Sequence, residues 1–85
     1  MLFEFQGPPQ ERAFWMRNTL IPLDILYLRP DGRVFSIARM TTPLSEAPIP
    51  SGGPISAVLE INGGLADRLG IAPGDRVRHR LFPGG

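Results

Sequence analysis

The 85-residue sequence contains no cysteine and no lysine, and its one histidine is His79. Without cysteine, the chain has no thiol nucleophile, disulfide, thiolate zinc site or iron–sulfur cluster. Without lysine, it has no Schiff-base amine and lacks the lysine of a phosphate-binding loop. A single histidine excludes multi-histidine metal sites. These absences predict no catalytic nucleophile, no metal and no cofactor, and they leave arginine, carboxylate, amide and tryptophan chemistry for any site.

Charge and hydrophobic runs limit the partners in the same way. The formal net charge is +1 and no basic run occurs, which argues against binding of nucleic acid. The longest apolar stretch, residues 20–28, is interrupted by Pro22 and Asp24 and is too short to span a bilayer. The first residues lack the basic start and long apolar segment of a signal peptide. The sequence as written predicts a cytoplasmic protein that does not insert into a membrane.

Ten glycines and ten prolines divide the chain into short apolar segments. We expect residues 1–85 to form one small domain, because folding at this length buries only about 60–65% of the surface of the unfolded chain. Alternating or continuous apolar patterns predict strands over residues 2–5, 13–17, 23–28, 34–38, 56–61 and 76–82. The predicted fold is mainly β, a small antiparallel barrel or sandwich of five to six short strands with one short helix near the C-terminus.

One hairpin is marked by its turn residues. Pro30 presets φ for a turn and Gly32 supplies a positive φ, so residues 34–38 are expected to pair antiparallel with the strand that ends at Leu28. Four prolines and two glycines between residues 41 and 54 predict a loop in that segment.

The helix is expected just after Asn62, which can act as its N-cap, and it is expected to end at Gly70. The backbone N–H groups of Asn62, Gly63 and Gly64 also suggest a weak anion site, because a helix N-terminus attracts negative charge. Capping is the more common use of such residues.

Two carboxylates lie within apolar strand patterns. Asp24 and Glu60 would be costly to bury unless they were paired, and Arg17 and Arg39 are available partners. If these groups converge, they form either a ligand site or an acid–base pair of carboxylates. The alternative is a structural ion network, which places charges in the same way and is the more frequent case.

The polar pair Asn18–Thr19 interrupts an apolar stretch immediately after Trp15 and Arg17. One interpretation is a bend, in which both side chains satisfy backbone groups. The other places the pair on the rim of a cleft, with Trp15 as a stacking surface for a carbohydrate. The predicted ligand-binding residues are therefore Trp15, Arg17, Asn18, Thr19, Asp24 and Glu60.

Residues 14–28, Phe-Trp-Met-Arg-Asn-Thr-Leu-Ile-Pro-Leu-Asp-Ile-Leu-Tyr-Leu, resemble the F-W-M-K/R-N-T-x-I-P-L-D signature of the bacterial and archaeal family called domain of unknown function 192. The resemblance continues through Asp31-Gly32, residues 58–61 and residues 74–77. It implies a compact mainly β fold and no known reaction. Relatives often carry export or lipoprotein signals, which points to the periplasm or cell envelope.

Family members usually begin with a further strand, so the resemblance implies that residues 1–85 are an N-terminally incomplete copy. An absent strand leaves an open sheet edge, through which the chain could dimerise.

Three functions are compatible with the sequence. The leading hypothesis is a non-enzymatic bacterial β-domain that binds a small polar, anionic or carbohydrate-like ligand in the cell envelope. The alternatives are a structural or protein-interaction module and, third, a hydrolase using Asp24 and Glu60.

Overall fold

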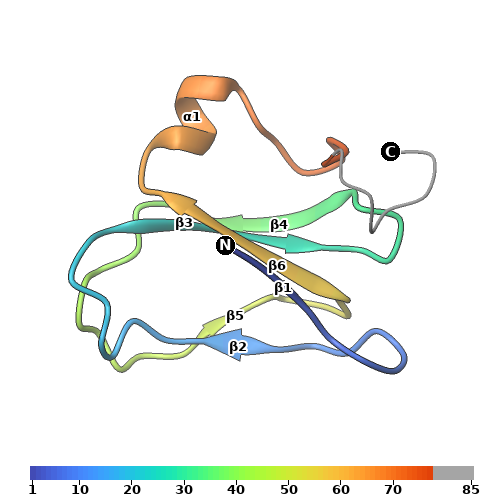
Figure 1. Ribbon diagram of the computed structural model, residues 1–85, viewed down its shortest axis with the longest axis horizontal. Coiled ribbons are helices and arrows are strands. Elements are labelled where there is room, and N and C mark those ends of the chain that lie inside the picture. The colour runs from blue at the N-terminus through green and yellow to red at the C-terminus, as the bar shows by residue number, and fades with distance from the viewer. Residues whose placement is uncertain (78–85) are drawn as a thin grey trace.

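The computed structural model describes residues 1–77, which form two antiparallel sheets and one short helix (Figure 1). The larger sheet contains four strands in the order β1-β6-β3-β4, and the smaller one pairs β2 with β5. The elements are β1 (Leu2–Glu4), β2 (Ala13–Phe14), β3 (Leu23–Leu28), β4 (Val34–Ala38), β5 (Ile49–Pro50), β6 (Ala57–Asn62) and α1 (Leu65–Leu69). The mainly β prediction is confirmed, and the strands of the described part form open layers rather than a closed barrel.

The central strand β3 separates two hydrophobic clusters. Alternate residues of a strand point to opposite faces of the sheet. Leu26 and Leu28 therefore pack on the side that carries α1, whereas Ile25 and Tyr27 pack on the side that carries the β2–β5 ribbon. All four are fully buried, which explains why the sequence of β3 is apolar at almost every position. Figure 1 shows the helix and the ribbon on opposite sides of the four-stranded sheet.

The predicted hairpin is confirmed. Strands β3 and β4 pair antiparallel from Ile25 opposite Ala38 to Leu28 opposite Val34. The connecting turn has Gly32 at a φ of 85°, and its N–H donates to the carbonyl oxygen of Arg29 at 2.9 Å. The positive φ explains why glycine stands at this position.

The prediction that residues 41–54 form only a loop is wrong, because β5 lies within that segment. Ala13 pairs with Pro50 and Phe14 with Ile49. A proline is tolerated in a strand at a sheet edge, where no neighbour requires its missing N–H. The Tyr27 hydroxyl donates to the Ile49 carbonyl oxygen and so ties β5 to the larger sheet. This bond joins residues far apart in sequence, which a local pattern does not reveal.

Of two other predicted strands, one is shorter than expected and the other lies mostly outside the described residues. The strand expected over residues 13–17 is limited to β2, because the Thr19 N–H donates to the Met16 carbonyl oxygen at 3.1 Å and closes a turn. Of the strand expected over residues 76–82, only residues 76 and 77 are described. Arg76 forms an isolated bridge with Arg33. His79 lies outside the described residues.

The helix begins after Gly64 rather than after Asn62. Asn62 is the last residue of β6 and is exposed, so the prediction that it caps the helix is wrong. Gly64 occupies the N-cap with a φ of 89° and has no side chain that could supply a cap hydrogen bond. Gly70 ends the helix in the left-handed conformation, as expected.

Candidate functional site

The segment from Phe14 to Arg17 alternates between the interior and the surface. Met16 is 1% exposed, and the Thr41 hydroxyl donates to its sulfur at 3.2 Å. Its neighbour Trp15 is 52% exposed. The alternation follows from an extended backbone, in which successive side chains point in opposite directions. The alternation buries Met16 and presents Trp15 and Arg17 to solvent.

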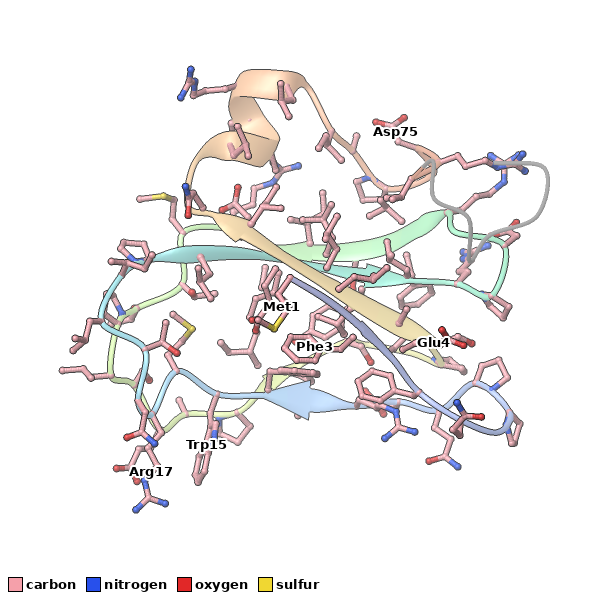
Figure 2. The ribbon with its side chains drawn as sticks, viewed as in Figure 1. Met1, Phe3, Glu4, Trp15, Arg17 and Asp75 are labelled. Atoms are coloured by element: carbon pink, nitrogen blue, oxygen red, sulfur yellow. The ribbon has the colours of Figure 1, made fainter. Side chains whose placement is uncertain are left out.

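Trp15 borders a shallow hollow on the outer side of the β2–β5 ribbon. The hollow has a volume of about 180 Å³ and is lined by Ala13, Phe14, Trp15 and Pro48. The guanidinium carbon of Arg17 lies 5.3 Å from the centroid of the Trp15 ring, within the range of a cation–π contact. Figure 2 shows both side chains projecting away from the four-stranded sheet.

Asn18 and Thr19 belong to the turn that carries Arg17. Asn18 is exposed, and Thr19 is half-buried, with a carbonyl oxygen that accepts the N–H of Leu44 at 3.0 Å. Among residues 1–77, the Arg17 guanidinium makes no hydrogen bond or ion pair. The turn therefore combines a bend with an uncommitted cation beside an accessible indole.

Asp24 lies on the other side of the molecule and is fully buried beside the start of α1. Its carboxylate accepts the N–H groups of Met40 at 2.9 Å, Gly64 at 3.2 Å and Ala66 at 2.9 Å. Burial opposes ionisation, but these three donors and the positive charge of Arg39 outweigh it, so the pKa of Asp24 is lowered. The carboxylate serves as the cap that the helix does not obtain from Asn62.

This arrangement also corrects the anion site expected at Asn62, Gly63 and Gly64. The negative group at the helix N-terminus is the chain's own Asp24 carboxylate, which occupies the N–H groups of Gly64 and Ala66. The prediction recognised the electrostatic preference of the position but assigned it the wrong occupant.

Glu60 does not approach Asp24. In the β3–β6 register Asp24 stands opposite Ile61, and Glu60 stands opposite Ile25. Directly opposed residues share a face, so Asp24 points to the α1 side and Glu60 to the ribbon side. Two carboxylates on opposite faces of one sheet cannot act on one bond, and the hypothesis of a hydrolase using this pair is wrong.

The other charged groups near these carboxylates are engaged elsewhere. The Arg39 guanidinium pairs with Asp67 at 2.6 Å and donates to the Ile71 carbonyl oxygen, so it forms no ion pair with Asp24 or Glu60. Burial, with a contribution from the charge of Glu60, raises the pKa of the Tyr27 hydroxyl to about 12. The structure thus divides the six predicted residues: Trp15, Arg17, Asn18 and Thr19 lie together, whereas Asp24 and Glu60 lie apart from them.

Exposed apolar side chains next to the turn were not predicted from the sequence. Two neighbouring loops expose four large side chains, and two of these have a positive φ, Met40 at 48° and Leu44 at 63°. The left-handed conformation is strained for such residues. The available signal in the sequence was the adjacent apolar pair Leu20 and Ile21, which precedes the predicted strand over residues 23–28. The four side chains are Leu20 (78% exposed), Ile21 (54%), Met40 (55%) and Leu44 (55%).

A larger hollow of about 440 Å³ lies on the α1 side of the sheet, between its apolar face and the segment that follows the helix. Its polar lining residues are already engaged, since the Asp75 carboxylate accepts the N–H of Ala72 at 2.8 Å and Arg76 also has a partner. We assign no ligand to this hollow. Its lining residues are Leu26, Val34, Leu59, Ile71, Asp75, Arg76 and Val77.

Residues 1–77 contain no group of three or more histidine, aspartate or glutamate side chains placed to hold a metal ion. None of the helices in this part of the chain is long and apolar enough to cross a membrane.

The chain belongs to the DUF192 family, described as an uncharacterized ACR, and the match covers residues 1–79. It is similar to the crystal structure of a protein of unknown function from Novosphingobium aromaticivorans DSM 12444, with 56% identity and a TM-score of 0.86. It is also similar to a protein from Sinorhizobium meliloti 1021 described as a candidate transcription regulator, with 45% identity and a TM-score of 0.85. A comparison with curated proteins gave no match.

These similarities confirm the family resemblance and the mainly β fold. They cover 93% and 89% of this chain, but only 56% and 58% of the two solved chains. The chain thus spans less than two thirds of the length of either protein.

Proposed function

We propose that the chain is a non-enzymatic binding module that holds a small, polar, carbohydrate-like ligand against Trp15. The observation that carries this proposal is the half-exposed indole, which borders a hollow and has beside it the Arg17 guanidinium, unpaired within residues 1–77. A sugar ring offers C–H groups that pack on an aromatic face and hydroxyl groups that require donors and acceptors at its rim.

The size of the hollow limits how the ligand binds. Pockets that enclose a whole small ligand usually measure about 300–1,000 Å³. At about 180 Å³, the hollow beside Trp15 admits one ring-sized group and leaves the rest of the ligand on the open surface. A saccharide unit within a longer chain fits this requirement, so the proposed ligand is a polysaccharide or glycolipid. Its proposed location in the cell envelope rests on the family resemblance.

The turn supplies polar groups at the edge of the hollow. The guanidinium of Arg17 offers five N–H donors in a planar fork, which suits hydroxyl or carboxylate oxygens. Asn18 adds an amide that donates and accepts, and it is exposed in the same turn. These groups favour a polar ligand with an acidic substituent over a purely apolar one.

The test is a titration with N-acetylglucosamine, glucose and glucuronate. Because Trp15 is the one tryptophan of the chain, its fluorescence reports on the proposed surface directly. We expect a saturable change with at least one of the three sugars. We also expect glucuronate to lose more affinity than glucose when Arg17→Gln removes the charge.

Thermal stabilisation by the same sugars measures binding in variants without the indole. Trp15→Ala is expected to abolish the stabilisation, and Trp15→Phe to retain part of it. Leu69→Ala is the matched control, because Leu69 is an exposed apolar residue at 65% on α1, away from the turn. Sugar binding that survives in Trp15→Ala would contradict the proposal, as would the absence of any response in the unmodified chain.

A further inference from the structure

Strand β1 forms one edge of the four-stranded sheet. It pairs with β6 on one side, and within residues 1–77 no strand pairs with its other side. Figure 1 shows β1 at the margin of the sheet, and Figure 2 shows Met1, Phe3 and Glu4 along it. An open edge is a template for another strand unless prolines, charges or a covering segment block it.

The register identifies the unpaired backbone groups. The Glu60 N–H donates to the carbonyl oxygen of Met1 at 2.8 Å, and the Phe5 N–H donates to the carbonyl oxygen of Ser56 at 2.9 Å. In an antiparallel pair, residues alternate between hydrogen-bonded and non-hydrogen-bonded positions. The N–H and C=O groups of Leu2 and Glu4 therefore point away from β6, toward the open edge.

The side chains of this segment form an apolar row on the ribbon side of the sheet. Phe3 and Phe5 contact the Phe14 ring, with centroid distances of 6.2 and 6.1 Å. Met1 shares their strand parity and is 76% exposed. The row ends at the turn that begins with Gly7, whose φ is 85°.

We propose that this edge binds a second copy of the chain, with the two β1 strands antiparallel and continuous in one eight-stranded sheet. In the register that pairs all of these outward groups, Leu2 lies opposite the partner's Glu4, and Phe3 lies opposite the partner's Phe3. The four outward N–H and C=O groups of each strand then form four hydrogen bonds across the two-fold axis.

The side chains support a second copy because the row is complementary to itself. In this register Met1 lies opposite the partner's Phe5, and Phe3 opposite the partner's Phe3, so every pair on the ribbon side is apolar. On the other face each Glu4 carboxylate lies beside the partner's Leu2. The two carboxylates are therefore staggered and do not oppose each other directly. An unrelated strand would have to supply this pattern independently.

The contact is expected to be weak. Five residues from each copy make a contact smaller than the roughly 1,200 Å² at the lower end of stable standard-size interfaces. The concentration series is therefore chosen to detect a dissociation constant of about 0.1–1 mM. Sedimentation velocity over a concentration series should show a monomer below about 10 µM and a growing dimer fraction as the concentration approaches this range.

Glu4→Pro tests the backbone contact, because it removes an outward N–H that β6 does not use, and a proline of this kind is tolerated at a sheet edge. It deletes two of the four intermolecular hydrogen bonds and should weaken dimerisation about tenfold or more. Glu4→Thr is the matched control, since it removes the same carboxylate, keeps the N–H and should still dimerise.

Amide hydrogen exchange in the unmodified chain gives a second test that requires no variant to fold. The amides of Leu2 and Glu4 should become protected as the concentration rises. Protection of the Phe5 amide, which is bonded within the chain, should stay constant. A chain that remains monomeric at 1 mM overturns the proposal, as does dimerisation that Glu4→Pro leaves unchanged. These readouts do not involve Trp15, so they stand or fall independently of the sugar titration.

Discussion

Two regions of the molecule arise from the same motif and have opposite properties. At its C-terminal end, Asp24 is a buried carboxylate whose oxygens accept three backbone N–H groups. At its N-terminal end, Trp15 and Arg17 lie on the surface, and among the described residues the guanidinium makes no hydrogen bond or ion pair besides its cation–π contact with the indole ring. The Asp24 carboxylate is therefore buried and fully hydrogen-bonded within the fold, whereas the Arg17 guanidinium is exposed at the surface.

The difference shows how to separate structural from functional residues in a motif of this kind. A buried polar group with a full set of partners is accounted for by stability, because leaving such a group unpaired costs about 1–3 kcal/mol. An exposed tryptophan beside a cation that has no hydrogen-bond or ion-pair partner among residues 1–77 is not accounted for by stability. The comparison therefore assigns Asp24 to the fold and supports the proposal that the Trp15–Arg17 pair serves recognition, and four predictions test this division.

The largest effect is expected for Asp24→Asn. The substitution replaces one accepting oxygen with an NH₂ group, which would face backbone N–H donors and cannot accept from them. We expect a loss of about 3–5 kcal/mol in the free energy of unfolding, because a hydrogen bond to a charged group is lost and a buried backbone N–H is left without an acceptor. Urea denaturation followed by circular dichroism measures it.

The matched control is Asp67→Asn, which removes another carboxylate near the same helix. Asp67 is exposed and pairs with Arg39, and such surface pairs contribute about 0–1 kcal/mol. If the two variants were equally stable, Asp24 would not be the structural residue that its hydrogen bonds indicate.

The next largest effect is expected for Met16→Ala. The Met16 side chain is 1% exposed and also accepts a hydrogen bond from the Thr41 hydroxyl. Truncation of a buried methionine leaves a cavity and costs about 2–5 kcal/mol. Thermal and urea unfolding should both report this loss, and Met16→Leu should recover most of it because the volume is nearly conserved. A loss below about 0.5 kcal/mol would show that the interior half of the motif does not hold the turn.

Parts of this division could be predicted from the sequence, and others could not. The β3–β4 hairpin was predictable, because Pro30 and Gly32 determine a local turn between two apolar strands. Strand β5 was hidden, because Pro48 and Pro50 indicate a loop and the Tyr27 hydrogen bond that secures it is not local. Turns set by neighbouring residues could thus be predicted from the sequence, whereas contacts between distant residues could not.

The candidate site shows the same limit. The adjacency of Trp15, Arg17, Asn18 and Thr19 follows from their positions in one turn. The separation of Asp24 from Glu60 depends on strand register, and a shift of one residue would have reversed it. No periodicity in the sequence shows that Asp24 would cap a helix 40 residues further along the chain.

A smaller loss in the free energy of unfolding is expected when the pH is lowered. Because the pKa of Asp24 is lowered by folding, the unfolded chain takes up its proton first as the pH falls. The stability from this carboxylate is fully present above its unfolded pKa of about 3.9, and it is lost as the pH falls through the lower folded value. Urea midpoints measured from pH 6 to pH 2 should decline over that window.

The contribution of Asp24 to this decline is isolated by comparison with Asp24→Asn, in which the slope should be shallower. Part of the slope should remain, since the pKa of Asp31 is also lowered, first by the N–H of Arg33. Equal slopes in the two proteins would mean that Asp24 titrates alike in the folded and unfolded chain, against the direction that its hydrogen bonds predict.

The smallest effect on stability is expected for Trp15→Ala, one residue away from the buried Met16. Although an alanine substitution removes the largest side chain of the protein, half of the indole is already in water, and its cation–π contact with Arg17 is exposed. Exposed contacts of this type contribute about 0.5–1 kcal/mol, so the unfolding free energy should fall by about 1 kcal/mol or less. A loss as large as that of Met16→Ala would make Trp15 a structural residue and remove the basis for assigning it to a ligand. A small loss, together with the sugar response disappearing in the same variant, would show that adjacent positions of one extended segment serve the fold and recognition separately.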